Sequence, residues 1–255
     1  MFYLNSQEEK KNMKALFKLE YLLIKRDVLT FLLSIGMPVL FFLLFSSFMV
    51  FQDKELERVV IRNYLVTMTG FSMSGFAVFT LPNMLKLDEK NKWIIHIKHL
   101  PIALFSYYTV KICRVLIGYL LSIIVCFSVG IFMKNIVFTP FELISTVCLL
   151  LMTGMVYIAV GIALNCLRSF QLVSVVGNIV YFVLAIFGGS WIPVSQFPEW
   201  MQQVAKFVPT YYTNNLVIEF LNDKALNVTA LVVTFLYTIG CLSFAYVIQK
   251  RREVK

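Results

Sequence analysis

The sequence has few charged residues, and they are missing from six long stretches. Asp, Glu, Lys and Arg together make up 15% of the 255 residues. A soluble chain of this length could not bury six long runs of uncharged, mostly apolar residues, so the pattern excludes an ordinary soluble protein. The six stretches are 28–52, 63–85, 115–133, 143–167, 169–198 and 225–249.

Residues typical of catalytic and metal sites are also scarce. The two histidines, His96 and His99, lie outside the six stretches, so an intramembrane serine protease would have no base there. They lack further ligands nearby, and we therefore expect no metal site. The five cysteines form no C-x-x-C pair and are interpreted as small apolar packing residues. We expect no catalytic residue and no cofactor bound by this chain.

A Walker A phosphate-binding loop is absent. The nearest spacing, Gly70 to Gly75, is followed by Phe76 and Ala77 instead of Lys and Ser or Thr. The six stretches also hold no Asp or Glu, so a proton relay would have no acidic residue to use. These absences exclude ATP hydrolysis through that motif and disfavour a proton-coupled transporter.

The residues that are present predict an all-α integral membrane protein. Hydrophobic residues make up 59% of the chain, and its mean hydropathy is +0.79. A helix of about 20 apolar residues crosses a bilayer core about 30 Å thick. Each stretch meets or nearly meets that length, which predicts six transmembrane helices within residues 28–255. The charged segment 52–62 between the first two is expected to be a short loop.

The basic residues predict the orientation of these helices. The chain carries a net charge of +9, and 17 of its 23 Lys and Arg residues fall in the termini and in the loops after the second and fourth spans. By the positive-inside rule, both termini are expected in the cytoplasm of a cell-membrane protein. The positive charge then faces anionic lipid headgroups, and no nucleic-acid partner is needed to explain it.

Segment 1–27, ahead of the first span, is expected to form a basic amphipathic helix over residues 8–26. Its apolar residues fall on one face, which would lie in the membrane interface. The alternative is a plain cytosolic tail. The apolar residues are Met13, Leu16, Phe17, Tyr21 and Ile24.

Residues 86–102 form the longest cytoplasmic loop, and it is expected to contain a short amphipathic helix. Trp93, Ile94, Ile97 and Leu100 recur at helical spacing, with charged residues between them. At the start of the third span that follows, Lys111 and Arg114 are expected to extend toward the lipid headgroups instead of carrying a buried functional charge.

Residues 192–221 contain two apolar segments that are too short to span a membrane. Pro209 separates them, and Gly188 and Gly189 precede them. Two short helices dipping into the outer leaflet, a re-entrant hairpin before the last span, fit this pattern. The second span is rich in small and polar residues, which indicates either close helix packing or a polar path. Small residues Ala159, Gly161 and Ala163 predict a helix contact on the fourth span.

Two motifs resemble the permease subunit of ABC type-2 exporters, and the resemblance covers essentially the whole chain. The segment Gly188–Tyr212 is similar to the family's glycine, apolar-Pro, Pro-x-Trp and x-Pro-x-x-Tyr pattern. Residues Asp88–Lys90 leading to Leu100–Ile102 resemble its coupling segment, although Asn91–Trp93 replaces the common Gly-Thr. The resemblance implies six spans, an interfacial N-terminal helix, a cytoplasmic coupling helix and a re-entrant hairpin.

The same resemblance implies roles for three groups of residues. Contact with a cytosolic ATPase is implied for Lys86, Asp88, Glu89, Lys90, Trp93 and Ile97. A substrate path is implied for Phe71, Phe76, Phe79, Asn178, Tyr181 and Phe182. An outer gate is implied for Pro193, Pro198, Trp200, Phe207 and Tyr211.

The function implied is that of a half-transporter. It would pair with a second copy or a sister permease and export a drug, lipid or membrane-active peptide. ATP and Mg²⁺ would bind to the separate ATPase subunit. The alternative is an ATP-independent membrane module, such as a channel-like or immunity protein. A membrane enzyme would need a reactive constellation that the sequence does not contain.

Overall fold

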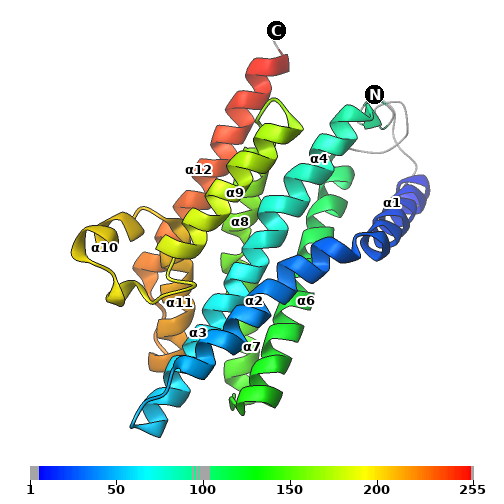
Figure 1. Ribbon diagram of the computed structural model, residues 1–255. Helices are drawn as coiled ribbons and strands as arrows, with labels where there is room; N and C mark the ends of the chain where they lie inside the picture. Colours follow the sequence, from blue (N-terminus) through cyan, green and yellow to red (C-terminus); the bar gives the residue numbers. More distant parts are fainter. Residues whose placement is uncertain (1–5, 94, 96, 98–103, 254–255) are drawn as a thin grey trace.

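The computed structural model describes residues 6–93, 95, 97 and 104–253, which are helical and contain no strand. Figure 1 shows them as one bundle, with α1 beside it near one end. We call this the α1 end, at which α12 also finishes, and the opposite end, at which α3 and α7 begin, the far end. The elements are α1 (Ser6–Arg26), α2 (Val28–Phe48), α3 (Lys54–Gly75), the π-helix η1 (Phe76–Thr80), α4 (Leu81–Lys90), α6 (Leu104–Lys134), α7 (Pro140–Thr153), α8 (Met155–Leu164), α9 (Phe170–Phe187), the 3₁₀ turn η2 (Val194–Gln196), α10 (Glu199–Ala205), α11 (Pro209–Asp223) and α12 (Val228–Glu253).

Among the described residues, six helical segments are long and apolar enough to cross a membrane, so the predicted number of spans is confirmed. They are Val28–Phe48, Lys54–Lys90, Phe105–Lys134, Pro140–Leu164, Phe170–Phe187 and Val228–Arg251. The predicted fifth stretch runs to residue 198, but α9 ends at Phe187. Gly189 adopts a left-handed φ of +74°, which favours glycine and ends the helix, while the charge pattern alone does not detect such a break.

The second span is longer than the charge pattern predicted. The segment 52–62 is not a loop, because α3 begins at Lys54. Asp53 caps this start: its Oδ1 accepts hydrogen bonds from the backbone N–H groups of Glu55 (2.9 Å) and Leu56 (3.4 Å). From there α3, η1 and α4 continue as one helical segment of 37 residues, about 55 Å long.

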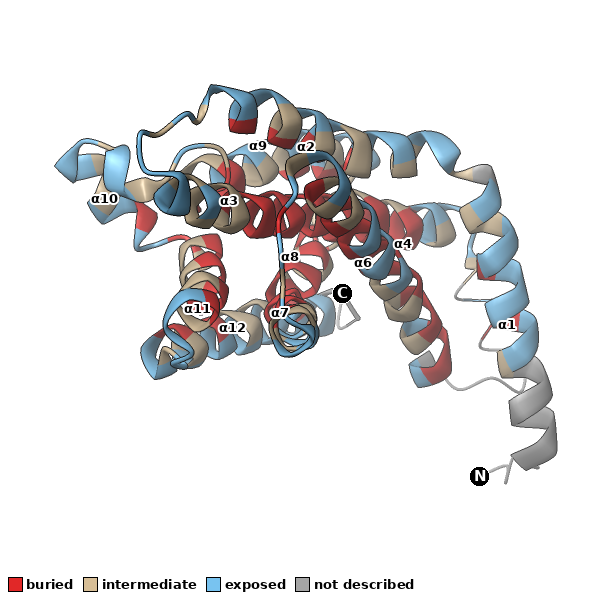
Figure 2. Ribbon diagram, turned by 90° about the horizontal axis from the view of Figure 1, so that it is seen from below, coloured by how far each residue is buried: buried red, intermediate tan, exposed pale blue. Residues whose placement is uncertain are grey.

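This long segment is the centre of the molecule. Figure 2 shows that buried residues gather along α3, whereas α1, α2 and α12 expose much of their surface. Apolar side chains such as Leu29 and Leu32 on α2 and Phe235 on α12 are more than half exposed. An apolar outer surface around a buried central helix suits a protein whose outer solvent is lipid.

Small residues allow the neighbours of the central segment to approach closely, which supports packing as their role. A Cβ added to Gly161 of α8 would overlap the backbone carbonyl of Ala77 in η1, so the predicted contact on the fourth span is confirmed. Ser72 Oγ bonds the carbonyl of Ser34 on α2 (2.8 Å) and Ser122 Oγ on α6 (2.9 Å). These hydroxyls satisfy one another inside the bundle.

Between α9 and α12 lie the two short helices α10 and α11. Figure 1 shows α10 projecting from the side of the bundle, while α11 lies along it. Pro209 is the first residue of α11, where its missing N–H has no intrahelical partner to lose. Whether this pair dips into the membrane from the outside stays a prediction, as does the interfacial position of α1.

Candidate functional site

The expected coupling residues begin on the last turns of α4. Lys86 is buried and its Nζ lies 2.6 Å from Glu89 Oε2. Lys90 is exposed, whereas Trp93 packs against the core and Ile97 is buried. Residues 94, 96 and 98–103 lie outside the described residues, and so does most of the predicted coupling helix.

Asp88 faces the bundle and bonds to α6. Its Oδ2 lies 2.7 Å from Lys111 Nζ and accepts a 2.5 Å hydrogen bond from the Tyr107 hydroxyl. Lys111 Nζ also lies 2.7 Å from Glu20 Oε1 on α1. One ammonium group therefore connects α1, α4 and α6.

Arg114, one helical turn further along α6, makes a second connection. Its Nη1 donates to Glu20 Oε2 (2.9 Å) and its Nη2 to Asp27 Oδ2 (3.0 Å). Asp27 is the residue between α1 and α2, and Thr30 donates to its other oxygen at 2.5 Å. We call Glu20, Asp27, Asp88, Lys111 and Arg114 the charge cluster.

The expectation that Lys111 and Arg114 extend to the lipid surface is wrong. Their exposed fractions are only 4% and 6%, because three carboxylates from α1, α4 and the α1–α2 junction surround them. Sequence reasoning missed Glu20 and Asp27 altogether. The available signal was Glu20, an acidic residue four positions after buried Leu16 and so on the same face of a basic helix.

The ion pairs of the charge cluster connect α1, α4, α6 and the α1–α2 junction directly, with N–O distances of 2.7–3.0 Å. Three carboxylates face two cations, so its formal charge is −1 when all five groups are ionised. Removing one member of a buried ion pair leaves its partner charged in a medium of low dielectric constant, which is costly. Movement of the end of α4 must therefore either carry α6 and α1 with it or break these bonds.

Four of the six expected path residues meet in one aromatic cluster. The ring of Phe71 stacks on Tyr181 of α9 (centroids 4.6 Å apart), and Phe79 meets the same ring edge-on (5.0 Å). Trp191, which the sequence reasoning had not assigned to the path, lies 5.8 Å from both Phe71 and Phe182. The cluster joins the middle of the central segment to α9 and to the start of the α9–α10 connection.

The six path residues differ in exposure within the single chain. Phe71 and Phe76 are buried, and Phe76 packs on Phe31 of α2 at 4.9 Å. Phe182 is 46% exposed. Asn178 is also exposed and donates to the carbonyl of Ser174 (2.8 Å). The surface of α9 is thus the place where this set is accessible, and its role in transport stays a prediction.

The expected gate residues do not form one cluster. Trp200 and Phe207 are largely exposed, and Pro198 precedes α10 as its exposed cap residue. Pro193 and Tyr211 instead line a pocket at the far end.

A buried hydrogen bond holds α11 to the end of α9. Asn214 Nδ2 donates to the carbonyl of Gly188 (2.7 Å), and Gly188 has no room for a Cβ because Thr210 of α11 packs against it. Glycine at position 188 is thus needed for the close approach of α11.

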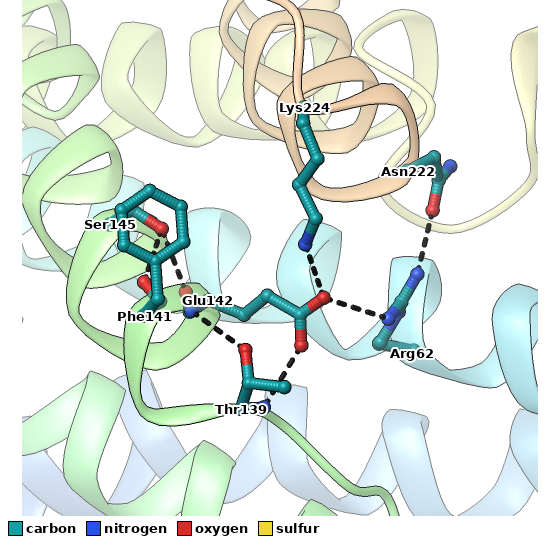
Figure 3. A network of polar contacts seen from close by, with 7 residues as sticks. All are labelled: Arg62, Thr139, Phe141, Glu142, Ser145, Asn222 and Lys224. Atoms are coloured by element: carbon teal, nitrogen blue, oxygen red, sulfur yellow. Dashed lines mark hydrogen bonds and ion pairs between the residues drawn. The ribbon is translucent and has the colours of Figure 1, made fainter.

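A polar network at the far end ties α3, α7 and α11 together (Figure 3). Glu142 and Thr139 form a reciprocal cap at the start of α7. The same carboxylate accepts from Lys224 at the end of α11 and lies 3.9 Å from Arg62 Nη1 on α3. Arg62 Nη2 also donates to Asn222 Oδ1 at 3.0 Å.

Comparison with known proteins agrees with this architecture. Residues 11–222 match the family described as ABC-2 type transporter. The chain is 23% identical to the protein named "Putative transport permease YvfS" of Bacillus subtilis (strain 168) over 220 residues, which cover 86% of this chain and 89% of that protein. The match includes every span except the last, together with the charge cluster and the α10–α11 pair. This multi-pass membrane protein therefore belongs to the ABC-2 type transporter family.

Proposed function

We propose that the chain is the permease subunit of an ABC exporter that moves a lipophilic or amphipathic cargo out of the cell. A separate cytosolic ATPase subunit hydrolyses the ATP, with Mg²⁺. The α1 end and both termini face the cytoplasm, as the distribution of basic residues supports. A second copy or a homologous permease completes the path.

The observation that carries the proposal is the charge cluster beside the expected ATPase contact. Asp88 lies two residues before the end of α4, at the start of the expected coupling segment. Its bonds to Lys111 and Tyr107 pass any displacement of that segment to α6, and Glu20 and Arg114 pass it on to α1 and the start of α2. A driven conformational change needs contacts that differ between two states, and short buried ion pairs supply such contacts.

The nature of the cargo is supported by the aromatic cluster at Phe71, Tyr181 and Trp191. Aromatic rings with few polar groups suit a lipophilic or amphipathic molecule. Phe182 and Asn178 are exposed on α9 beside the aromatic cluster, and a second permease chain would contact this surface of α9.

The test uses the permease co-purified with its ABC ATPase and reconstituted in liposomes. Asp88→Asn keeps the shape of the side chain and one acceptor oxygen, but it removes the charge and replaces the other oxygen with an NH₂ donor. We expect the complex to remain intact while cargo-stimulated ATP hydrolysis falls at least tenfold. Glu55→Gln, at an exposed ion pair of the far end, serves as the control and should leave stimulation unchanged.

Undiminished stimulation in Asp88→Asn would contradict the coupling role of the charge cluster. Cargo flux through the permease alone, without ATPase or ATP, would instead support the channel-like alternative.

A further inference from the structure

A pocket of about 460 Å³ lies beside the charge cluster at the α1 end, within the size range of small-molecule sites. It is bounded by the end of α1, the start of α2, the segment from η1 to α4, α6 and the first residue of α9. Four of the five members of the charge cluster line it, namely Asp27, Asp88, Lys111 and Arg114. The charge cluster is therefore part of a pocket wall as well as a link between helices.

The accessible charge in this pocket is negative. The side chains of Asp27 and Asp88 are 33% and 17% exposed, whereas those of Lys111 and Arg114 are only 5% and 6% exposed. Each of the two cations also lies between two carboxylates. A molecule that enters the pocket therefore meets carboxylate oxygens and finds both cations already paired.

One carboxylate oxygen of the wall is not used by the protein. Asp88 contacts Lys111 and Tyr107 through Oδ2 alone. Its Oδ1 accepts no hydrogen bond from the described part of the chain, and it is not a buried atom. A carboxylate oxygen can only accept, so a partner must bring an N–H or O–H donor. Because the charge cluster carries −1 when all its groups are ionised, a positively charged donor would also balance its charge.

Apolar side chains form the rest of the wall. Leu23, Phe79 and Met84 lie on three different elements around the pocket. Leu87 and Phe170 also line it, and both are more than half exposed. An apolar body attached to a charged group could therefore extend along Leu87 and Phe170 toward the surrounding lipid.

We propose that this pocket binds the ammonium group of an amphiphile. The ammonium donates to Asp88 Oδ1, Asp27 adds to the negative field, and the apolar body lies along Leu87 and Phe170. A molecule with a charge of +1 neutralises the charge cluster, whereas an acid would add charge of the same sign. As recognition of cargo this rests on the proposed function, since an amine cargo would bind at the expected coupling residue. The binding itself does not.

The test measures binding of radiolabelled dodecylamine to the purified permease in phosphatidylcholine nanodiscs, with the signal of empty nanodiscs subtracted. Dodecanol and dodecanoic acid are the competitors, because they keep the chain length but lack the positive charge. We expect one saturable site per chain and at least tenfold weaker competition by both compounds than by unlabelled dodecylamine.

The ammonium group could come from a membrane lipid or from another amphiphile, and a second set of nanodiscs separates the two sources. These nanodiscs contain phosphatidylethanolamine, whose headgroup carries the same ammonium group. Loss of dodecylamine binding in them would support the ammonium site and identify the lipid headgroup as its occupant. Unchanged binding would support the site for an amine other than this lipid.

Asp88→Asn is the decisive variant, because it removes the charge that the ammonium pairs with. We expect the affinity for dodecylamine to fall at least tenfold, the effect of one hydrogen bond between charged groups, and the preference over dodecanol to disappear. Asp27→Asn should weaken binding about twofold to fivefold. Glu89→Gln is the control, since this exposed neighbouring carboxylate pairs with Lys86 and lies outside the pocket lining. It should leave the affinity unchanged.

Equal competition by dodecanol, the absence of saturable binding, or unchanged affinity in Asp88→Asn would each overturn the inference. Thermal melting shows whether the variants are folded, and the competition series on the unaltered protein decides without them. The proposed function is judged separately by ATP-driven transport. Selective binding without such transport would leave the site assigned and reject the exporter, whereas transport without selective binding would do the reverse.

Discussion

Arg114 joins two elements through a single side chain. Its planar guanidinium reaches Glu20 on α1 with one nitrogen and Asp27 at the α1–α2 junction with the other. A lysine at this position has a single nitrogen in place of the two separate Nη atoms that reach these carboxylates, so it could not keep both contacts in the same geometry. The α1–α2 corner therefore depends on the shape of this side chain as well as on its charge.

Replacing Arg114 tests this dependence. Arg114→Met should lower the free energy of unfolding by about 3–5 kcal/mol, because two carboxylates lose a buried partner. Arg114→Lys should cost less, since one ion pair survives. Thermal and chemical unfolding of the purified protein in detergent measures both.

The control for this series is Arg58→Met, at an exposed ion pair with Glu55, which should have little effect. Equal losses at positions 58 and 114 would contradict a buried role for Arg114.

Gly161 permits the contact between α8 and the central segment. Gly161→Ala places a methyl group against the backbone carbonyl of Ala77, and backbone cannot move aside as a flexible side chain can. We expect a loss of about 1–3 kcal/mol in stability, from the same unfolding assay.

The matched substitution is Gly240→Ala on α12, where a Cβ would meet nothing within 4 Å. It should be neutral or stabilising, because alanine favours the helix. A larger loss at position 240 than at position 161 would refute the assignment of this contact.

At the scale of whole elements, the first turn of α7 connects three helices at the far end through Glu142. Its capping carboxylate serves at the same time as the acceptor for Lys224 and the neighbour of Arg62. The start of one helix is therefore fixed to the end of α11 and to the first turns of α3 (Figure 3).

Two substitutions of Glu142 separate these roles. Glu142→Gln can still form the cap but loses the ion pairs, whereas Glu142→Ala loses both. We expect stability losses of less than about 1 kcal/mol and of about 1–2 kcal/mol, respectively. Hydrogen exchange at the first turn of α7 should accelerate only in Glu142→Ala. Acceleration of equal size in both would show that the charge, not the cap, holds this turn.

The elements were predictable to different degrees, for physical reasons. The six spans can be predicted from the lengths of the apolar stretches alone, because those lengths are a property of the sequence and do not depend on tertiary contacts. The start of α3 at Lys54 was missed because its charged first turns resemble a loop, although Asp53 followed by Glu55 and Glu57 is a helix-start signal. The π-helix at Phe76–Thr80 has no signal in the apolar pattern.

The charge cluster could not be assembled from the sequence. Arg114 is separated from its partners Glu20 and Asp27 by 94 and 87 residues, and nothing local marks them as neighbours. The family pattern predicts Asp88 as a coupling residue, and that role stays a prediction, whereas its bonds to Tyr107 and Lys111 required the fold. The resemblance named four residues of the aromatic cluster as path residues without predicting that their rings meet, and it did not name Trp191, which belongs to the connection after α9.

At the scale of the whole molecule, orientation in the membrane is the property on which the proposed function depends. Single cysteines at positions 90 and 224, in a background without the five native cysteines, report the two ends. We expect a membrane-impermeant thiol reagent to label Lys224→Cys in intact cells and Lys90→Cys only after permeabilisation. The reverse pattern would place the ATPase contact outside the cell and eliminate an ABC permease mechanism.

The uninterrupted segment from Lys54 to Lys90 can act as a lever. The contact between Ala77 and Gly161, where there is no room for a Cβ, would act as a pivot and divide the segment into arms of about 35 Å toward Lys54 and about 20 Å toward Lys90. If the segment tilts as a rigid rod, a push of about 3 Å beside Lys90 becomes a swing of about 5 Å at the opposite tip. A small stroke on one side of the bilayer is thereby magnified on the other.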